Sequence, residues 1–222
     1  MQDFRDQPYA AYEPPFPRRK KRSVFFWLMI WIPVGVVGGS LLLVAAGALF
    51  MLTARDEPLT AEDRQHLPDI ELLAELTDDF APDENDATVT KMRYIDGSYD
   101  IEYEYDSPDD FFAPYIYYCL TVEPNHGDAM TTYGLSWQAT KIGMWGEDAE
   151  IEIVERNDLF KWGDASRFAI IKADGAPTGN IFVARSGRIV VDMIISGIYF
   201  DTPGGFGSLM NPTLENIKRD LP

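Results

Sequence analysis

Few residues in the sequence have the types and spacing that catalysis needs. The 222 residues include two histidines, His66 and His126, and a single cysteine, Cys119. His66 falls in an acidic stretch and His126 in a loop before a helical pattern, so both are interpreted as exposed loop histidines rather than general bases. Cys119 lies in an apolar strand pattern without a basic or histidine neighbour, which favours a buried, inert thiol. These residues therefore predict no catalytic centre.

Motifs that bind phosphate groups or metal ions are also absent from the sequence. The run GGFG at 204–207 is too short for a phosphate-binding loop, and we expect a flexible turn there. Residues 78–86 (DDFAPDEND) offer oxygen ligands of the kind that Ca²⁺ prefers. Their spacing does not match a calcium loop, so we expect an acidic, solvated loop and predict no metal and no cofactor. No pair of carboxylates stands out as a general acid and base, and the sequence favours a non-catalytic protein.

Two aromatic groups could instead contact a partner. Phe111 and Phe112 stand near several tyrosines, and Tyr199 and Phe200 run into the glycine-rich segment that contains Phe206. Aromatic residues on loops next to glycine often form contact surfaces. The alternative interpretation is that these rings close the end of the hydrophobic core.

The elements that would position such a surface follow a long apolar stretch. Residues 24–52 read VFFWLMIWIPVGVVGGSLLLVAAGALFML, and no ionisable residue occurs from Ser23 to Ala54. As a helix this stretch would measure about 45 Å at ~1.5 Å per residue, which exceeds the ~30 Å hydrocarbon core of a bilayer. We therefore predict one transmembrane helix over residues 23–54. A cleaved signal peptide is the alternative, but the apolar region is too long for one.

A basic cluster precedes the predicted helix and sets its orientation. Such clusters keep their flank of a span in the cytoplasm and contact anionic lipid headgroups. The cluster consists of Arg18, Arg19, Lys20, Lys21 and Arg22. We predict that residues 1–22 form a disordered cytoplasmic arm. The C-terminal domain is then periplasmic or extracellular, held at a cell inner membrane or plasma membrane.

Two glycines in the predicted span, Gly35 and Gly39, form a G-x-x-x-G pair. Small residues one turn apart let a second helix approach closely. The pair therefore predicts a contact with another membrane protein, with the general abundance of glycine in membrane helices as the alternative.

The part of the chain after the predicted span is strongly acidic. Residues 55–222 carry 13 Lys/Arg against 33 Asp/Glu, a balance of −20. Because nucleic-acid binding depends on Lys and Arg contacts to phosphates, this charge argues against nucleic acid and favours cations, basic proteins or a neutral surface. One cysteine permits no intrachain disulfide, which favours a bacterial over an animal extracytoplasmic domain.

The clearest local pattern is a hairpin over residues 88–106. Its turn, Asp96-Gly97, is typical of a two-residue hairpin connection. In that register two pairs of opposite charge face each other on the solvent side of the sheet. These pairs are Arg93 with Asp100 and Lys91 with Glu102.

The remaining patterns predict an acidic linker over residues 55–86, with a short helix capped by Asp69, and a mixed domain over residues 87–222. Further strands are expected over 112–122, 150–154, 168–171, 181–184 and 189–195, and helices over 128–141 and from Asn211. The predicted fold class is α+β. It consists of a mainly antiparallel sheet of six or seven strands with two or three flanking helices, preceded by one transmembrane helix.

Several features of the C-terminal segment occur in a fixed order. They are a strand ending in Trp162-Gly163-Asp164, a strand over 167–173, a hairpin with the turn Arg185-Ser186-Gly187-Arg188, and a closing helix. In this order and turn placement the segment resembles PsbP-like extracytoplasmic domains. The resemblance implies an antiparallel sheet with flanking helices, often in an accessory or assembly component of a membrane complex. It implies no site residues.

The sequence thus predicts a single-pass, membrane-anchored binding or accessory subunit of a membrane protein complex, without catalysis. Its expected partners are the bilayer and another membrane protein. One alternative is a ligand sensor that signals through the span, which needs a pocket. Another is an envelope hydrolase that uses carboxylates, which needs two convergent acids in a cleft.

Overall fold

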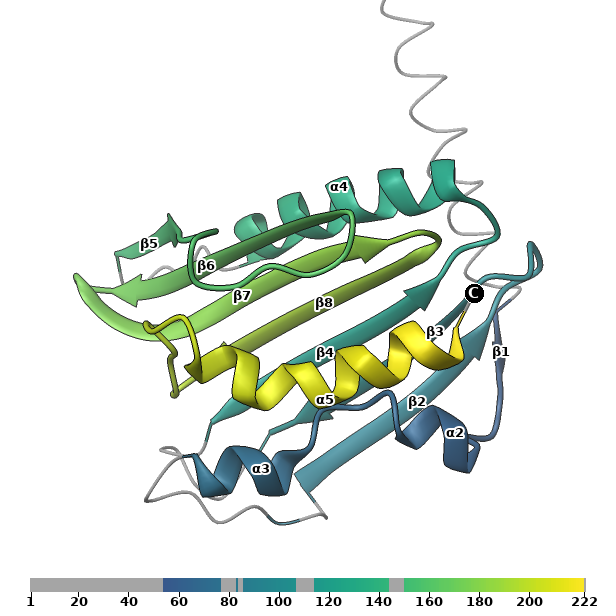
Figure 1. Ribbon diagram of the computed structural model, residues 1–222, viewed down its shortest axis with the longest axis horizontal. Helices are drawn as coiled ribbons and strands as arrows, with labels where there is room; N and C mark the ends of the chain where they lie inside the picture. Colours follow the sequence, from purple (N-terminus) through teal and green to yellow (C-terminus); the bar gives the residue numbers. More distant parts are fainter. Residues whose placement is uncertain (1–53, 77–82, 84–85, 107–113, 144–149, 222) are drawn as a thin grey trace, which may run out of the picture. The chain divides into compact units, whose positions relative to one another are not determined.

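The computed structural model describes residues 54–76, 83, 86–106, 114–143 and 150–221. These residues form an antiparallel sheet of eight strands in the order β1-β2-β3-β4-β8-β7-β6-β5, with four helices (Figure 1). The strands are β1 (Arg55–Asp56), β2 (Ala87–Arg93), β3 (Tyr99–Tyr105), β4 (Tyr115–Val122), β5 (Ile151–Glu155), β6 (Ala165–Ala173), β7 (Ala176–Ser186) and β8 (Ile189–Ser196). The helices are α2 (Ala61–Arg64), α3 (Ile70–Glu75), α4 (His126–Gly143) and α5 (Gly205–Asp220).

Alternation of side chains along the strands gives the sheet two faces. We call the face that α2, α3 and α5 cover the inner face, and the face that α4 covers the outer face. On the inner face, alternate residues such as Tyr103 and Tyr118 are buried in the main core with one side of α5, which runs across the front of the sheet in Figure 1. On the outer face, Trp137 of α4 packs against Ile181 and Val183 of β7 in a smaller core.

Phe206 fixes the start of α5 on the inner face. Its ring is 1% exposed, and its centroid lies 4.9–6.0 Å from those of four other rings, Phe160, Phe168, Phe182 and Phe200. The helix therefore begins at Gly205, and the predictions of a flexible turn at 204–207 and a helix start at Asn211 are wrong. Pro212 lies inside the helix with its ring exposed. It cannot donate an N–H to the carbonyl of Ser208, and burial of Phe206 outweighs that cost.

The loop of the β2–β3 hairpin is one residue longer than predicted. Tyr94 N donates to Ser98 O at 2.9 Å, and Gly97 N donates to Tyr94 O at 3.1 Å. The loop is therefore residues 95–97, with Gly97 at φ +90° in the left-handed region. Three-residue loops that end in such a glycine are common in hairpins. The Asp-Gly pair fits both loop lengths, and here Asp96 Oδ1 also accepts a hydrogen bond from Ser98 N at 2.9 Å.

This change of register moves two cations to the other side of the sheet. Lys91 pairs with Ile101 and Arg93 pairs with Tyr99, so both basic side chains lie on the inner face. A shift of one residue always exchanges the faces of a strand. The predicted pairs of Arg93 with Asp100 and of Lys91 with Glu102 are therefore wrong, and the two acids lie on the outer face without them.

The predicted fold class is also corrected. The described part of the chain has eight strands and four helices rather than six or seven and two or three. The additional elements are the short strand β1 and the single turn of α2, which begins with a capping box of Thr60 and Asp63. Within the described ranges, no helix is both long and apolar enough to cross a membrane. Residues 23–53 of the predicted span lie outside those ranges.

Candidate binding face

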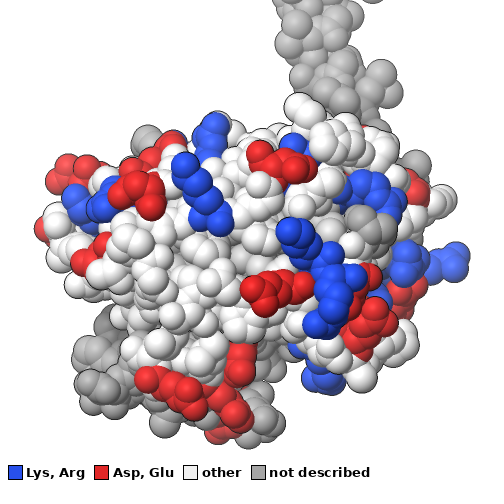
Figure 2. All heavy atoms as spheres, viewed as in Figure 1, with Lys and Arg blue, Asp and Glu red and all other residues white. Residues whose placement is uncertain are grey.

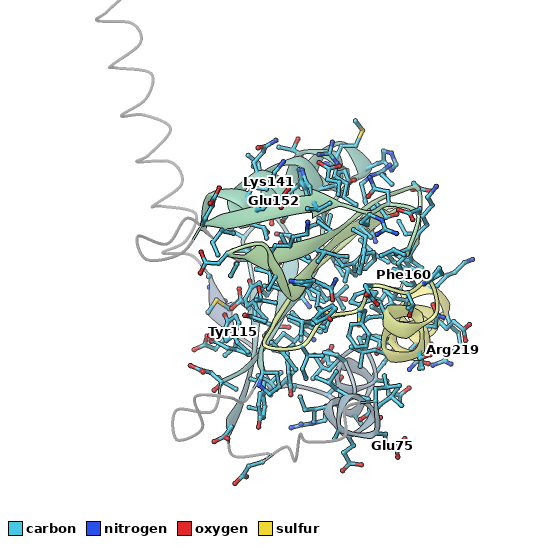
Figure 3. All side chains as sticks on the ribbon, turned by 90° about the vertical axis from the view of Figure 1, so that its left-hand side faces the viewer. Glu75, Tyr115, Lys141, Glu152, Phe160 and Arg219 are labelled. Atoms are coloured by element: carbon cyan, nitrogen blue, oxygen red, sulfur yellow. The ribbon has the colours of Figure 1, made fainter. Side chains whose placement is uncertain are left out.

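The outer face of β3 and β4 and the adjoining part of β8 carry an unusual set of polar side chains. We call this set the carboxylate–tyrosine face. It consists of Asp100, Glu102, Glu104, Tyr94, Tyr115, Tyr117, Cys119 and Asp192. The described helix on this side, α4, packs on β7 and β8. Figure 3 shows Tyr115 on the opposite side of the sheet from α5.

The carboxylates along β3 each accept a hydrogen bond from a tyrosine. They stand at alternate positions of the strand, so all three project from the same face. The hydroxyl donors are Tyr94 to Asp100 at 2.8 Å, Tyr117 to Glu102 at 3.4 Å and Tyr115 to Glu104 at 3.2 Å. Each aromatic ring thus holds one carboxylate in place without neutralising its charge.

A fourth carboxylate extends the set across the sheet towards α4. Glu102 of β3 is the direct neighbour of Cys119 of β4, which is the direct neighbour of Asp192 of β8. Neighbouring strands are about 4.8 Å apart, so these residues form a row across three strands. The row ends beneath α4. There the hydroxyls of Ser136 and Thr140 interact with the Asp192 carboxylate by hydrogen bonding, which lowers its pKa in part.

The electrostatics of the face show negative charge without a counter-ion. Burial raises the pKa of Asp192 to about 6, and burial also raises the pKa of Asp100 and Glu102, with a further increase in Glu102 from the charge of Asp100. No Lys or Arg of the described chain forms an ion pair with these carboxylates. Lys91 and Arg93, the basic residues of β2, pair with acids on the inner face instead.

Cys119 does not supply a nucleophile to this face. Burial, followed by the negative charge of Asp100, raises the pKa of its thiol well above the ordinary value. Its Sγ lies 3.7 Å from Thr121 Oγ1. A thiol that stays protonated is a poor nucleophile and a poor metal ligand. Among the described residues, no group of three or more His, Cys, Asp or Glu side chains is arranged to hold a metal ion.

The sequence-predicted partner surface is placed only in part. Tyr199 is 44% exposed, whereas Phe200 is 9% exposed and Phe206 is in the core. Phe200 and Phe206 fit the alternative interpretation, in which the rings close the hydrophobic core, because both pack around the start of α5. Phe111 and Phe112 lie outside the described residues.

The predicted membrane contacts, Gly35 and Gly39, and the basic cluster at 18–22 also lie outside the described residues. Of the histidines, His126 is exposed beside Arg185, with its Nε2 3.0 Å from Arg185 Nη1. His66 is buried rather than exposed: its Nε2 lies 3.4 Å from Asp220 Oδ2, and its carbonyl accepts a hydrogen bond from Tyr118 at 2.7 Å. The carbonyl contact explains why this loop residue is held inside.

Sequence reasoning missed Asp192 and the row that it forms with Cys119 and Glu102. The alternation of acid and tyrosine along β3 was visible and correctly identifies a strand with one wet face. The pairing of β4 with β8 carries no local signal, because the two strands are separated by α4 and three other strands.

Comparisons of the chain with protein-family models, curated proteins and solved structures find no match. The resemblance of the C-terminal segment to PsbP-like domains therefore stays a prediction.

Proposed function

We propose that the chain is a non-catalytic, membrane-anchored binding subunit whose outer domain captures a basic protein segment on the carboxylate–tyrosine face. The observation that carries the proposal is the set of three carboxylates on β3, each oriented by a tyrosine and none paired with a cation of the described residues. A cationic partner would supply the missing charge. It would also lower the raised pKa of Asp100 and Glu102, because a nearby positive charge favours the ionised carboxylate.

The spacing of the acids favours an extended partner. Residues two apart on a strand are separated by about 6.8 Å, which is also the spacing of same-side residues in an extended peptide. Lysines or arginines at alternate positions of the partner could therefore meet Asp100, Glu102 and Glu104 in turn. The adjacent tyrosine rings offer faces for cation–π contacts. The face lies on a sheet surface, which suits a macromolecular partner better than a small molecule, since small-molecule sites are concave.

The sequence supports a location for the domain and its partner at a membrane. The apolar stretch 24–52 and the basic cluster at 18–22 support a tether with the acidic domain outside the cytoplasm. The balance of −20 over residues 55–222 supports attraction of a basic partner from a distance. We therefore place the partner in the same membrane or beside it, as a protein with a basic extracytoplasmic segment.

A peptide titration tests the chemistry of the face on the full chain in detergent. The probe is a seven-residue peptide in which lysine and threonine alternate, compared with one in which the lysines are consecutive and one in which glutamate replaces lysine. We expect the alternating lysine peptide to bind most tightly, and its affinity to fall steeply with salt. The double variant Glu102→Gln with Glu104→Gln should weaken it at least tenfold.

The matched control is Glu152→Gln with Glu155→Gln on β5, whose acids already pair with Lys172 and Lys141. It should leave the affinity unchanged. Equal binding by both double variants would contradict the proposal, as would equal binding of the lysine and glutamate peptides.

A cross-linking experiment in cells tests the partner. A photoreactive phenylalanine analogue replaces Thr88, an exposed residue of β2 directly opposite Glu104. We expect a discrete cross-linked product whose mapped segment contains alternating basic residues, and we expect its loss in the Glu102 and Glu104 double variant. The same analogue at Ser208, exposed on α5, should not give this product. A product that survives the double variant would exclude the carboxylates as its binding site.

A further inference from the structure

The side of α4 that faces away from the sheet is an exposed and uncharged helix surface. Met130 is 58% exposed and Leu135 is 64% exposed, and no other described helix or strand carries two large apolar side chains with such exposure. Residues three or four apart share one side of a helix. We call this side the α4 surface. It consists of the exposed residues Met130, Thr131, Gly134, Leu135, Gln138 and Ala139.

The α4 surface lacks charge in a domain that is strongly acidic. No Asp, Glu, Lys, Arg or His occurs from Ala129 to Thr140, although residues 55–222 carry a balance of −20. The side of the molecule that α5 crosses is different, with acidic residues gathered over α3 and basic residues over the C-terminal part of α5 (Figure 2). Because net charge makes copies of a protein repel one another, a second copy meets little local repulsion at the α4 surface.

The helix α4 has apolar side chains on both of its sides. The side that faces the sheet buries Trp137 and Ala129, and Trp137 belongs to the smaller core of the outer face. A helix at a protein surface normally turns polar residues to water, and a helix that is apolar all round is normally buried. Met130 and Leu135 therefore indicate a contact that one copy of the chain does not make by itself.

The charges at the two ends of α4 fit a second copy that runs antiparallel. Asp128 lies in the first turn and Lys141 in the last turn, and the midpoint between them falls between Gly134 and Leu135. When two α4 helices pack antiparallel about this midpoint, Asp128 of each copy lies at the level of Lys141 of the other. A parallel pair would instead bring the two Asp128 carboxylates together.

Lys141 keeps donors for this second contact. Its Nζ lies 3.8 Å from Glu155 Oε1, and an ammonium group has three N–H donors. The two helices need approach no closer than the usual distance of about 8–10 Å between axes. A methyl group at Gly134 would not prevent that approach.

An antiparallel pair also keeps the two carboxylate–tyrosine faces apart. One helix from each copy separates the two sheets, which corresponds to about 20 Å at ~10 Å per helix. This separation exceeds the Debye length of ~8 Å at physiological ionic strength, so salt screens most of the repulsion between the faces. Both faces stay open to a basic segment.

We propose that the chain forms a two-fold symmetric homodimer in which two α4 helices pack antiparallel through the α4 surface. Leu135 of each copy packs near the centre of the interface, and Met130 packs towards each end. This inference goes beyond the proposed function and does not depend on it. It also differs from the predicted contact through Gly35 and Gly39, which concerns the span.

Disulfide trapping of the full chain in native membranes tests the direction of the helices. Two differently tagged copies, both with Cys119→Ala, carry either Thr131→Cys or Gln138→Cys. In the antiparallel arrangement Thr131 lies opposite Gln138 of the second copy, so the two variants should form a mixed disulfide. Each variant alone should form none, because its two cysteines lie about 10 Å apart at ~1.5 Å per residue, beyond the ~7 Å between Cα atoms that a disulfide spans. The control, Ser208→Cys on α5, should pair with neither.

Charge reversal tests the ends of the interface. Asp128→Lys and Lys141→Asp each place like charges at the same level, so each should raise the dissociation constant of the dimer about three- to tenfold. The measurement is energy transfer between labelled full chains that are diluted in detergent. An equal mixture of the two variants should recover the wild-type value, because every end of the mixed dimer then joins a lysine to an aspartate.

A substitution at the centre tests the apolar contact. Leu135→Glu places two carboxylates near the two-fold axis and should raise the dissociation constant at least tenfold. Ile95→Glu changes an exposed residue of the β2–β3 loop and should have no effect. Both side chains are exposed in the single chain, and thermal unfolding confirms that each variant is folded.

Several outcomes would overturn the inference. A monomeric chain would do so and would leave the α4 surface to the bilayer or to another protein. A dimer that survives Leu135→Glu but is lost in the double variant Gly35→Leu with Gly39→Leu would place the contact in the predicted span. Disulfides within each single-cysteine variant, or a mixture of the charge variants that dimerises no better than either alone, would exclude the antiparallel arrangement.

Discussion

Lys91 Nζ on β2 lies 2.9 Å from both carboxylate oxygens of Asp63 on α2, and both side chains are largely buried. The same carboxylate closes the capping box of α2 by accepting from Thr60 N at 2.8 Å. One ion pair thus fixes the short helix to the sheet. Since Leu59 and Arg64 at either end of this turn line a cavity of about 700 Å³ on the inner face, the pair also positions a wall of that cavity.

Replacement of Lys91 by methionine should destabilise the domain by about 2–4 kcal/mol, because it leaves the Asp63 carboxylate buried without a cation. The measurement is the free energy of unfolding from denaturant titration of the full chain in detergent. Lys172→Met is the control, since its pair with Glu152 is exposed and exposed pairs contribute less than about 1 kcal/mol. Equal losses in the two variants would show that the Lys91 pair is no more important than a surface contact.

Two buried tyrosines should respond in opposite ways to loss of the hydroxyl. Tyr118 Oη donates to His66 O at 2.7 Å, so Tyr118→Phe leaves a buried carbonyl unpaired and should cost about 1–2 kcal/mol. Tyr103 has no such partner among the described residues, so Tyr103→Phe should be neutral or slightly stabilising. Thermal unfolding of both variants checks this contrast. A loss in Tyr103→Phe as large as in Tyr118→Phe would mean that its hydroxyl already has a strong partner.

The stability of the domain should depend on the protonation of Asp192. Its folded pKa, about 6, lies above the ordinary value of 3.8, so the folded state binds this proton more tightly than the unfolded state. The free energy of unfolding should therefore fall as the pH rises from about 4 to about 6, and then level off. The contribution of this group is about 1–3 kcal/mol.

Asp192→Asn should remove this part of the pH dependence and raise the stability at pH 7 by a similar amount. The check is unfolding at several pH values between 4 and 8 for both proteins. Asp158→Asn is the control, because Asp158 is exposed and its pKa is lowered by Arg156. A wild-type profile that rises from pH 4 to 6, with no change in Asp192→Asn, would show that Asp192 titrates normally.

Alanine substitutions at two glycines, Gly179 and Gly134, should change the stability of the domain in opposite directions. A Cβ on Gly179 of β7 would lie 2.2 Å from Ile195 O, so Gly179→Ala forces the two strands apart and should cost at least about 2 kcal/mol. A Cβ on Gly134 of α4 would meet nothing within 4 Å. Gly134→Ala should therefore stabilise the helix by about 0.5–1 kcal/mol. Melting temperatures of the two variants decide, and a fall in both would contradict the open surroundings of Gly134.

Local patterns predicted most individual elements of this domain but not how they pair. The helix from Asp69, the helix over 128–141 and the hairpin around Ser186-Gly187 depend on caps, periodicity and turn residues, which neighbours in sequence supply. The predicted start of α5 was wrong because the helix begins where Phe206 is buried among four rings that are distant in sequence. That burial is a tertiary contact, which local patterns do not reveal. Tertiary packing routinely overrides glycine and proline preferences.

The lack of a basic neighbour at Asp100 and Glu102 was missed because the β2–β3 loop is one residue longer than predicted. The predicted two-residue turn placed Arg93 opposite Asp100 and Lys91 opposite Glu102. In that register both acids had a counter-ion and did not indicate a binding face. With the loop over 95–97, the same acids form no ion pair with a described Lys or Arg, and Lys91 instead pairs with Asp63 of α2. Both loop lengths suit Asp96-Gly97, and Tyr99 and Ile101 face inward in either case. The tertiary contacts of β2 decide between them, because Lys91 and Arg93 pair with Asp63 and Glu57 on the inner face.

The position of α5 after all eight described strands in the sequence has a consequence for biogenesis. Phe168 and Phe182 of β6 and β7 receive their cover from Phe206, which follows them in the sequence. Until the last helix is synthesised, and exported if the domain lies outside the cytoplasm, the sheet exposes an aromatic surface prone to aggregation. The domain therefore completes its core only after α5 has emerged, so a chain truncated before Gly205 would be a substrate for quality-control proteases rather than a partly active protein.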